Sequence, residues 1–246
     1  MKNICIKIEY IGTNYCGFQR QKNGLSIQQV VEEAILSATG EKVSIIPSGR
    51  TDAGVHALGQ VANFLYNGNI PTSKLKIVIN HHLPKDIRIV EVLEREKDFN
   101  ARKSAKKKTY LYKIFTGQNM SVFDEDRVLH YPHQLDFDLL NKCAKELVGE
   151  HDFTCYVASG ASNTTTKRTI YSASFERVGE YVFFRITGNG FLYNMVRILV
   201  GTMLEVATHK RPLQNFEQSL TGGKRADVGR TAKACGLYLE SVCYDT

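Results

Sequence analysis

The sequence predicts an α+β protein built from two similar halves, each with the element order β-α-β-β-α-β. Its 246 residues are enough for one large domain or two small ones. Short segments that alternate apolar and polar residues, typical of half-buried strands, are interspersed with segments that carry one apolar stripe, typical of helices. This order occurs once in residues 1–100 and again in residues 101–246. We therefore expect two ferredoxin-like (RRM-like) halves with antiparallel sheets, divided near residue 100.

The first half is expected to begin with a strand over Asn3–Tyr10, where apolar and polar residues alternate. A helix is expected over Ser26–Thr39, because apolar residues recur there at helical spacing, Ser26 and Gln29 can form a capping box and Gly40 can end the helix. The other elements expected in this half are strands over residues 42–47, 58–66 and 87–93 and a helix over residues 73–82.

The second half repeats this order. Asp136 is a suitable cap for a helix that Gly149 ends, and Gly179-Glu180 is a suitable hairpin turn between two strands. The expected strands cover residues 107–115, 168–178, 181–187 and 237–244, and the expected helices cover residues 137–148, 191–207 and 213–220.

The composition is that of an ordinary globular protein. Hydrophobic residues make up 43% and charged residues 23% of the chain, which excludes a disordered or fibrous protein. No apolar run approaches the roughly 18 residues of a membrane helix. The first ten residues alternate in polarity and lack the apolar core of a signal peptide. We expect a cytoplasmic protein with no membrane partner.

The net charge of +7 permits a polyanionic partner without proving one. A basic run precedes a predicted strand and contains no acid, so it is either a solvated face or a surface that follows phosphates. Its members are Arg102, Lys103, Lys106, Lys107 and Lys108. Arg168 is a weaker candidate for the same task.

The six cysteines carry no metal-site signature. No pair has CxxC spacing, and no histidine pair follows a cysteine pair. Cys5 and Cys143 fall on apolar stripes, where a free cysteine is a small core residue. We expect neither a metal nor a disulfide.

The most unusual segment is SGRTDAGVHA, at residues 48–57. Asp52 stands between Gly49 and Gly54, whose backbones can adopt conformations closed to other residues. This aspartate is either a turn residue or a positioned carboxylate. His56 is either a general base or, as we favour, a structural histidine.

These segments resemble the tRNA pseudouridine synthase A family over nearly the whole chain. The family's catalytic motif is similar to GRTDAGVHA at residues 49–57. Further similar segments are IEYIGTNYCGFQRQ, FNARKSAKKKTYLYKI, LVGEHDFT, FLYNMVRILVGTMLEV and GLYLESVCY. The resemblance implies the pseudouridine synthase fold and the isomerisation of uridine to pseudouridine at positions 38–40 of the tRNA anticodon stem-loop. It also implies that no cofactor or metal is needed and that a homodimer grips one tRNA.

The resemblance further implies roles for four residues. Asp52 would be the nucleophile, acting either at C6 of the uracil or at the ribose after loss of the base. Arg50 would replace the flipped uridine in the stack and hold a phosphate, although an ion pair with Asp52 is the alternative. Tyr110 would stack on the target uracil, whereas Tyr112 is expected in the core. Arg197 would pair with Asp52 and keep it ionised; the alternative is a snorkelling surface arginine.

The sequence departs from the family pattern at two places. Phe18 replaces a usual Trp, and the segment around Arg230 and Lys233 replaces a usual proline-containing stretch. These departures leave open a paralogous synthase with another RNA target, such as rRNA. A non-catalytic RNA-binding protein of RRM-like halves would have no use for Asp52. A glycosidase usually needs two carboxylates, and no second acid accompanies Asp52 in its segment.

Overall fold

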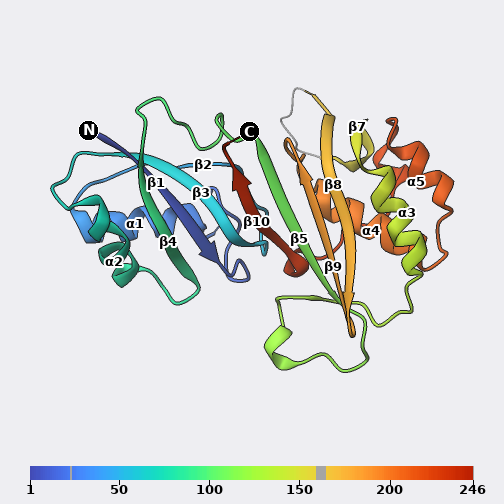
Figure 1. Cartoon of the computed structure of the whole chain (residues 1–246). Helices are drawn as coiled ribbons and strands as arrows, with labels where there is room; N and C mark the ends of the chain where they lie inside the picture. Colours follow the sequence, from blue (N-terminus) through green and yellow to red (C-terminus); the bar gives the residue numbers. More distant parts are fainter. Residues whose placement is uncertain (23, 159–164, 246) are drawn as a thin grey trace. The chain divides into compact units, whose positions relative to one another are not determined.

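The computed structural model describes residues 1–22, 24–158 and 165–245, and the chain forms two compact units (Figure 1). The first unit comprises Met1–Lys106 and Tyr238–Thr246, and the second comprises Lys107–Leu237. Among the described residues, no helix has both the length and the apolar character needed to cross a membrane.

The first unit contains a mainly antiparallel sheet with strand order β4-β1-β3-β10. β1 is antiparallel to both β3 and β4, whereas β10 is parallel to β3, and the short β2 pairs with β3. The elements are β1 (Lys2–Tyr10), α1 (Ile27–Thr39), β2 (Ile46–Pro47), β3 (His56–Tyr66), α2 (Thr72–His82), β4 (Ile87–Arg95) and β10 (Leu237–Cys243).

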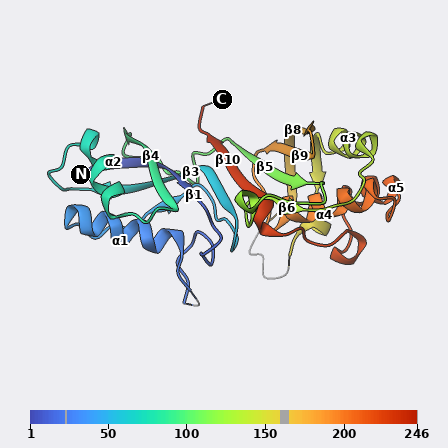
Figure 2. The ribbon, with the colours of Figure 1, turned by 90° about the horizontal axis from the view of Figure 1, so that it is seen from below.

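Alternation along β1 places its isoleucines in the core of this unit. Ile4, Ile6 and Ile8 are fully buried, as are the apolar residues of α1 and α2 that share this core: Ile27, Val31, Ile35, Leu75 and Ile79. Figure 2 shows α1, in blue, below the strands of the sheet. The helix begins where predicted, because the Ser26 hydroxyl accepts from the Gln29 amide at 3.2 Å, and it ends at Gly40, whose φ is 73°.

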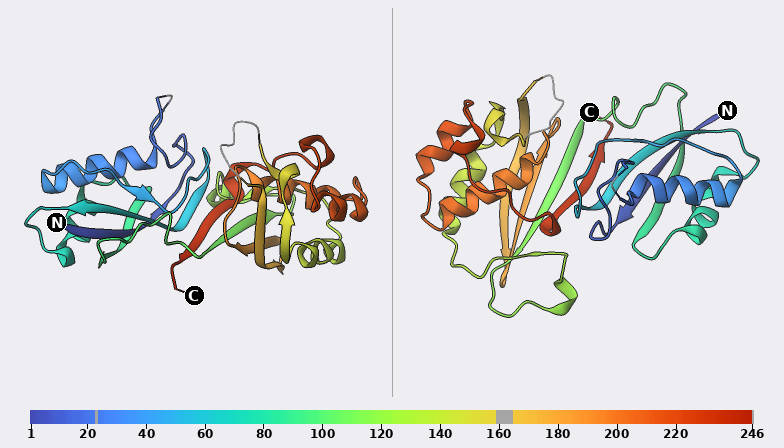
Figure 3. Two further views of the ribbon diagram at one scale, coloured as in Figure 1. Left: turned by 90° about the horizontal axis from the view of Figure 1, so that it is seen from above. Right: turned by 180° about the vertical axis from the view of Figure 1, so that it is seen from behind.

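The second unit contains an antiparallel sheet with strand order β5-β9-β8-β7, and β6 pairs with β5. The right-hand view of Figure 3 shows α3 and α4, in yellow-green and orange, beside these strands. The elements are β5 (Lys107–Phe115), β6 (Leu129–His130), α3 (Phe137–Glu146), β7 (Gly149–Asp152), β8 (Lys167–Val178), β9 (Tyr181–Gly188), α4 (Met195–Ala207) and α5 (Leu213–Ser219).

The α+β class, the mainly antiparallel pairing and the order of elements are confirmed. Two boundaries differ from those expected by four residues and the others by two or fewer, and the short strands β6 and β7 were not expected. β2 covers only Ile46–Pro47, and α4 begins at Met195 rather than at residue 191. The second difference arises because Asn194 has φ 60°, a left-handed conformation that cannot continue a helix.

The C-terminal strand lies in the first unit, whereas division of the sequence near residue 100 assigned it to the second half. Tyr238 and Leu239 of β10 pair with the start of β3. Val242 and Tyr244 then pack against a cluster formed by Cys5, Val61 and Ala101. Tyr244 also donates a hydrogen bond to the Ala101 carbonyl at 2.9 Å. Burial of these apolar side chains stabilises the packing of the C-terminal residues against the first unit.

All six cysteines lie in the described residues and none forms a disulfide. Cys5 and Cys143 are buried, which confirms their assignment to the core. Burial raises the pKa of the Cys143 thiol to about 12, so this side chain remains a neutral thiol at physiological pH.

Replacement of Tyr244 tests the role of the C-terminal residues in the first unit. Tyr244→Ala removes the packing on the Cys5 cluster and the bond to Ala101, and should lower the free energy of unfolding by about 3 kcal/mol. Tyr244→Phe removes only the hydroxyl and should cost about 1 kcal/mol. Urea unfolding measures both values. Equal stability of Tyr244→Ala and the parent would contradict this packing role.

Candidate functional site

Residues 48–55 form the loop between β2 and β3 that carries the unusual motif. In this loop Arg50 is exposed, Thr51 is buried and Asp52 is half-buried. We call this segment the Asp52 loop. The geometry of its neighbours determines how firmly the carboxylate is held.

Two residues from the segment after β1 fix Thr51. The Tyr10 hydroxyl and the Thr51 Oγ1 are 2.7 Å apart, and the Phe18 amide donates to the Thr51 carbonyl at 3.1 Å. Burial raises the pKa of the Tyr10 phenol, so Tyr10 stays neutral at this contact. Gly17 has φ 112°, and an added Cβ would lie 2.7 Å from the Thr51 carbonyl oxygen. Since both the side chain and the backbone of Thr51 are bound, the adjacent Asp52 has a defined position.

The far side of the Asp52 loop is held in the same way. The Gly54 amide donates to the Tyr15 carbonyl at 3.4 Å, and the Val55 amide donates to the Asp52 carbonyl at 3.1 Å. Gly54 has φ 75°, the left-handed conformation that favours glycine. An added Cβ at Gly12 would collide with the Val55 carbonyl.

His56 is fully buried at the start of β3. Its Nδ1 accepts a hydrogen bond from the Gly12 amide at 3.0 Å, so this nitrogen carries no proton in the structure. Its ring stacks on that of Tyr238, with a centroid separation of 4.6 Å. This environment supports the structural role favoured from the sequence.

The start of the Asp52 loop depends on a buried polar pair that sequence reasoning missed. The Ser48 hydroxyl donates to the Gln60 side-chain oxygen at 2.7 Å, and the Gln60 amide nitrogen donates to the Gly49 carbonyl at 2.9 Å. Both Ser48 and Gln60 are fully buried. A glutamine inside a mostly apolar strand was the available signal, because a buried amide needs hydrogen-bond partners.

The second unit carries the two tyrosines singled out in the sequence. Tyr112 is fully buried and donates to the Lys233 carbonyl at 2.6 Å, and burial raises the pKa of its phenol. Its expected core position is confirmed. Tyr110 is half-buried, and its ring meets the edge of Phe191 at a centroid distance of 5.1 Å and an interplanar angle of 83°. Of the two rings, that of Tyr110 is the one partly accessible to a ligand.

Arg197 is half-buried in the first turn of α4. Its Nε donates to the Ala232 carbonyl at 2.8 Å, and its Nη1 donates to the Asn194 side-chain oxygen at 2.7 Å. Two acceptors therefore fix the plane of the guanidinium. This arrangement differs from a snorkelling arginine, whose head group extends into water.

The basic residues are distributed over both units. Arg102, Lys103 and Lys106 are exposed in the first unit. In the second unit, the Lys107 ammonium lies 5.4 Å from the centre of the Tyr171 ring, and Arg168 donates to the Thr165 carbonyl at 3.0 Å. The Asp52 loop thus carries Arg50 and Asp52, and His56 follows directly at the start of β3, whereas Tyr110, Arg168 and Arg197 belong to the other unit.

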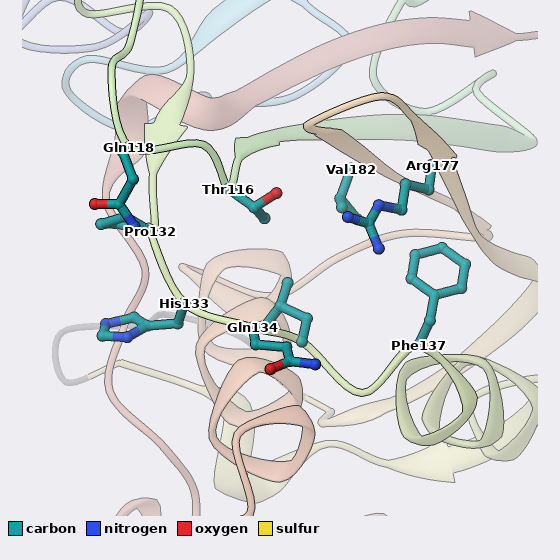
Figure 4. A pocket seen from close by; sticks show the side chains of 9 residues that line it. Thr116, Gln118, Pro132, His133, Gln134, Phe137, Arg177 and Val182 are labelled. Carbon is teal, nitrogen blue, oxygen red and sulfur yellow. The ribbon is translucent and has the colours of Figure 1, made fainter.

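The second unit also has a cavity of about 380 Å³, lined by other residues of that unit (Figure 4). Its lining includes Thr116, which follows β5, and Phe137 and Arg177. Thr116 is six residues from Tyr110, or about 20 Å along an extended strand. None of the site residues predicted from the sequence lines this cavity. Within the described ranges, no group of three or more His, Cys, Asp or Glu residues is arranged to hold a metal ion.

Comparison with known proteins agrees with the motifs. A family model described as tRNA pseudouridine synthase matches residues 6–102 and 143–245. The chain is 47% identical to tRNA pseudouridine synthase A of Acetivibrio thermocellus over 244 residues, covering 99% of this chain and 100% of the relative. It is 41% identical to the protein of the same name from Caldicellulosiruptor bescii, with the same coverage. A solved Cbf5-Nop10-Gar1 complex matches at 13% identity and a TM-score of 0.38, covering 82% of this chain and 44% of that chain, which is too weak for a structural argument.

The close approach at Gly12 gives a test of how the Asp52 loop is held. Gly12→Ala should lower the free energy of unfolding by about 1–3 kcal/mol, because the new methyl group must displace the Val55 carbonyl. Amide hydrogen exchange in residues 51–56 should accelerate. Gly190→Ala is the control, since its added Cβ would be no closer than 3.7 Å to Arg168. Unchanged exchange in Gly12→Ala would show that the loop is held without this contact.

Proposed function

The chain belongs to the tRNA pseudouridine synthase family and isomerises uridine to pseudouridine in tRNA, and from this premise we propose that it acts at positions 38–40 of the anticodon stem-loop with Asp52 as nucleophile. The observation that supports Asp52 most strongly is the anchoring of Thr51 by Tyr10 and Phe18. A nucleophile must be held close to its target, and such orientation lowers the barrier. Asp52 is also the one carboxylate within residues 48–57.

The proposed chemistry needs no oxidant and no external group. The N1–C1′ bond of uridine breaks, a C5–C1′ bond forms, and the proton lost from C5 is balanced by the proton gained at N1. An ionised Asp52 assists either by adding to C6 of the uracil or by bonding to the ribose carbon after the base has left. In both routes the carboxylate is released at the end, so one aspartate suffices.

A uridine in a stem must leave the stack before Asp52 can reach it, which costs a few kcal/mol. Arg50 is exposed and lies two residues from Asp52 on the same anchored loop. We assign to Arg50 the replacement of the flipped base and the binding of a flanking phosphate. A guanidinium suits both tasks because it is planar and always charged.

Tyr110 and Arg197 are proposed to act on the same uridine. The edge-on contact with Phe191 orients the Tyr110 ring, which is suited to stack on uracil. The guanidinium of Arg197 is oriented by Ala232 and Asn194. Its charge would favour the ionised, nucleophilic form of Asp52.

We assign binding of the RNA backbone to Lys106, Lys107, Lys108 and Arg168. We further propose that the protein is a homodimer and that it is located in the cytoplasm. The net charge of +7 supports a polyanionic substrate. Phe18, which stands where the family usually has Trp, gives no support for a different RNA target. Its side chain is fully buried beside Tyr10, with ring centres 6.1 Å apart. Lys233 is exposed, and we place it among the residues that adjust RNA binding.

Asp52→Asn should abolish pseudouridine formation while tRNA affinity stays within about tenfold, because affinity rests mainly on phosphate contacts. Tritium release from [5-³H]uridine-labelled tRNA measures turnover, and filter binding measures affinity. Asp98→Asn, at an exposed aspartate of the same unit, should retain parent turnover. Turnover by purified Asp52→Asn would exclude Asp52 as nucleophile. Pseudouridine mapping in cells lacking the protein tests the target: loss at positions other than 38–40 would refute that assignment.

Replacing Lys106, Lys107 and Lys108 together by Gln should weaken tRNA binding and reduce its salt dependence by up to about three phosphate equivalents. Turnover at saturating tRNA should change less than affinity. The matched control is the triple replacement of Lys74, Lys76 and Lys85, which are exposed on or just after α2 and remove the same charge. Equal salt slopes for the two triple variants would show that the basic run is a solvated surface that does not bind phosphates.

A further inference from the structure

Residues 229–233 form neither helix nor strand; they lie beside α4 and precede β10. We call it the 229–233 strap. The exposed side chains of Arg230 and Lys233 contrast with the backbone of the strap, which is bound at several points. Two further contacts of the strap backbone are to Arg197, the residue proposed above to support Asp52.

The strap is fastened at both ends. At one end, the Gly229 amide donates to the Thr202 hydroxyl at 3.0 Å, and the Arg230 amide donates to Glu205 Oε1 at 3.1 Å. At the other end, the Lys233 carbonyl accepts from the Tyr112 hydroxyl. An added Cβ at Gly201 of α4 would collide with the Arg230 carbonyl, so a glycine there lets the strap approach the helix.

The middle of the strap binds Arg197 twice. The Ala232 amide donates to the Arg197 carbonyl at 3.0 Å, and Arg197 Nε donates to the Ala232 carbonyl at 2.8 Å. The position of the Ala232 carbonyl therefore sets one of the two bonds that orient the guanidinium. Any displacement of the strap changes the direction of Arg197.

Glu205 is itself held firmly enough to serve as an anchor. Its Oε2 lies 3.1 Å from Arg211 Nη2 and 3.2 Å from Arg211 Nε, while Oε1 remains for the Arg230 amide. The side chain is 25% exposed. Eight residues of helix, about 12 Å, separate Glu205 from Arg197 in α4, so an effect of Glu205 on Arg197 must pass through other groups.

We propose that Glu205 is a positioning residue for pseudouridine formation, because it fastens the strap whose Ala232 carbonyl orients Arg197. The proposal rests on the proposed role of Arg197 at Asp52. Loss of this anchor should misdirect the guanidinium and slow the chemical step, without removing a contact to RNA. The expected result is a fall in kcat with little change in KM.

Glu205→Ala should lower kcat about tenfold and accelerate amide exchange in residues 229–233. Glu205→Gln retains a side-chain oxygen for the Arg230 amide and should restore kcat to within about threefold of the parent. Arg230→Gln is the control, since it removes a charged, exposed side chain of the strap but keeps the backbone amide that binds Glu205 Oε1. Arg230→Gln with as large a loss of kcat as Glu205→Ala would overturn the proposal. If Glu205→Ala does not fold, Thr202→Val is the second variant, because it removes the hydroxyl that binds the Gly229 amide. Thr202→Val should show the same fall in kcat with unchanged KM. A kcat equal to that of the parent in Thr202→Val would overturn the proposal.

A double-mutant cycle with Arg197→Leu separates this proposal from the proposed function. If Glu205 acts through Arg197, Glu205→Ala should have no further effect on kcat in the Arg197→Leu background. Additive losses would refute action through Arg197 while leaving the proposed role of Arg197 intact. Near-parent activity of Arg197→Leu alone would instead reject that role, and this inference with it.

Discussion

The hydrogen bonds that hold Thr51 are the constraint on which the candidate site of the first unit depends. Thr51 is bound through its hydroxyl by Tyr10 and through its carbonyl by the Phe18 amide. Both partners belong to the end of β1 and the segment after it, so the strand that organises the sheet also positions the loop. The tight approaches at Gly12 and Gly17 follow from this arrangement, because neither position has room for a side chain. Because these groups are buried, loss of one of these hydrogen bonds would leave a polar group without a partner, which costs free energy of folding.

The second unit uses the same strategy on Arg197. A charged side chain within a mostly buried helix needs partners, and for Arg197 a backbone carbonyl and an asparagine side chain provide them. The left-handed Asn194, which delays the start of α4, is also the residue whose side chain binds Arg197. Asp52 and Arg197 therefore each depend on an irregular segment that is itself fixed by regular structure. Preorganisation of this kind is what the proposed roles of Asp52 and Arg197 require.

Much of the fold could be predicted because its signals are local. Polarity alternates every second residue in β1, the apolar stripe of α1 recurs at helical spacing, and Ser26 and Gly40 bound that helix as expected. The hairpin turn at Gly179 was also correctly placed. The start of α4 was missed because Phe191 and Leu192 continue the apolar pattern, while the residue that breaks the helix, Asn194, adopts a conformation that no pattern encodes. The short β2 was overestimated for a related reason: its pairing with β3 depends on register, which alternation alone does not specify.

The candidate residues themselves came from the sequence. Its motifs pointed to Asp52, Arg50, Tyr110 and Arg197, and to the family that the comparisons then identified. The contacts that hold these residues in position became apparent only from the tertiary structure. The pair Ser48 and Gln60, the placing of β10 in the first unit and the strap across α4 all join residues distant in the chain. The physical reason is that a motif records which side chains the chemistry requires, whereas hydrogen bonds and packing between remote segments arise only when folding brings their surfaces together.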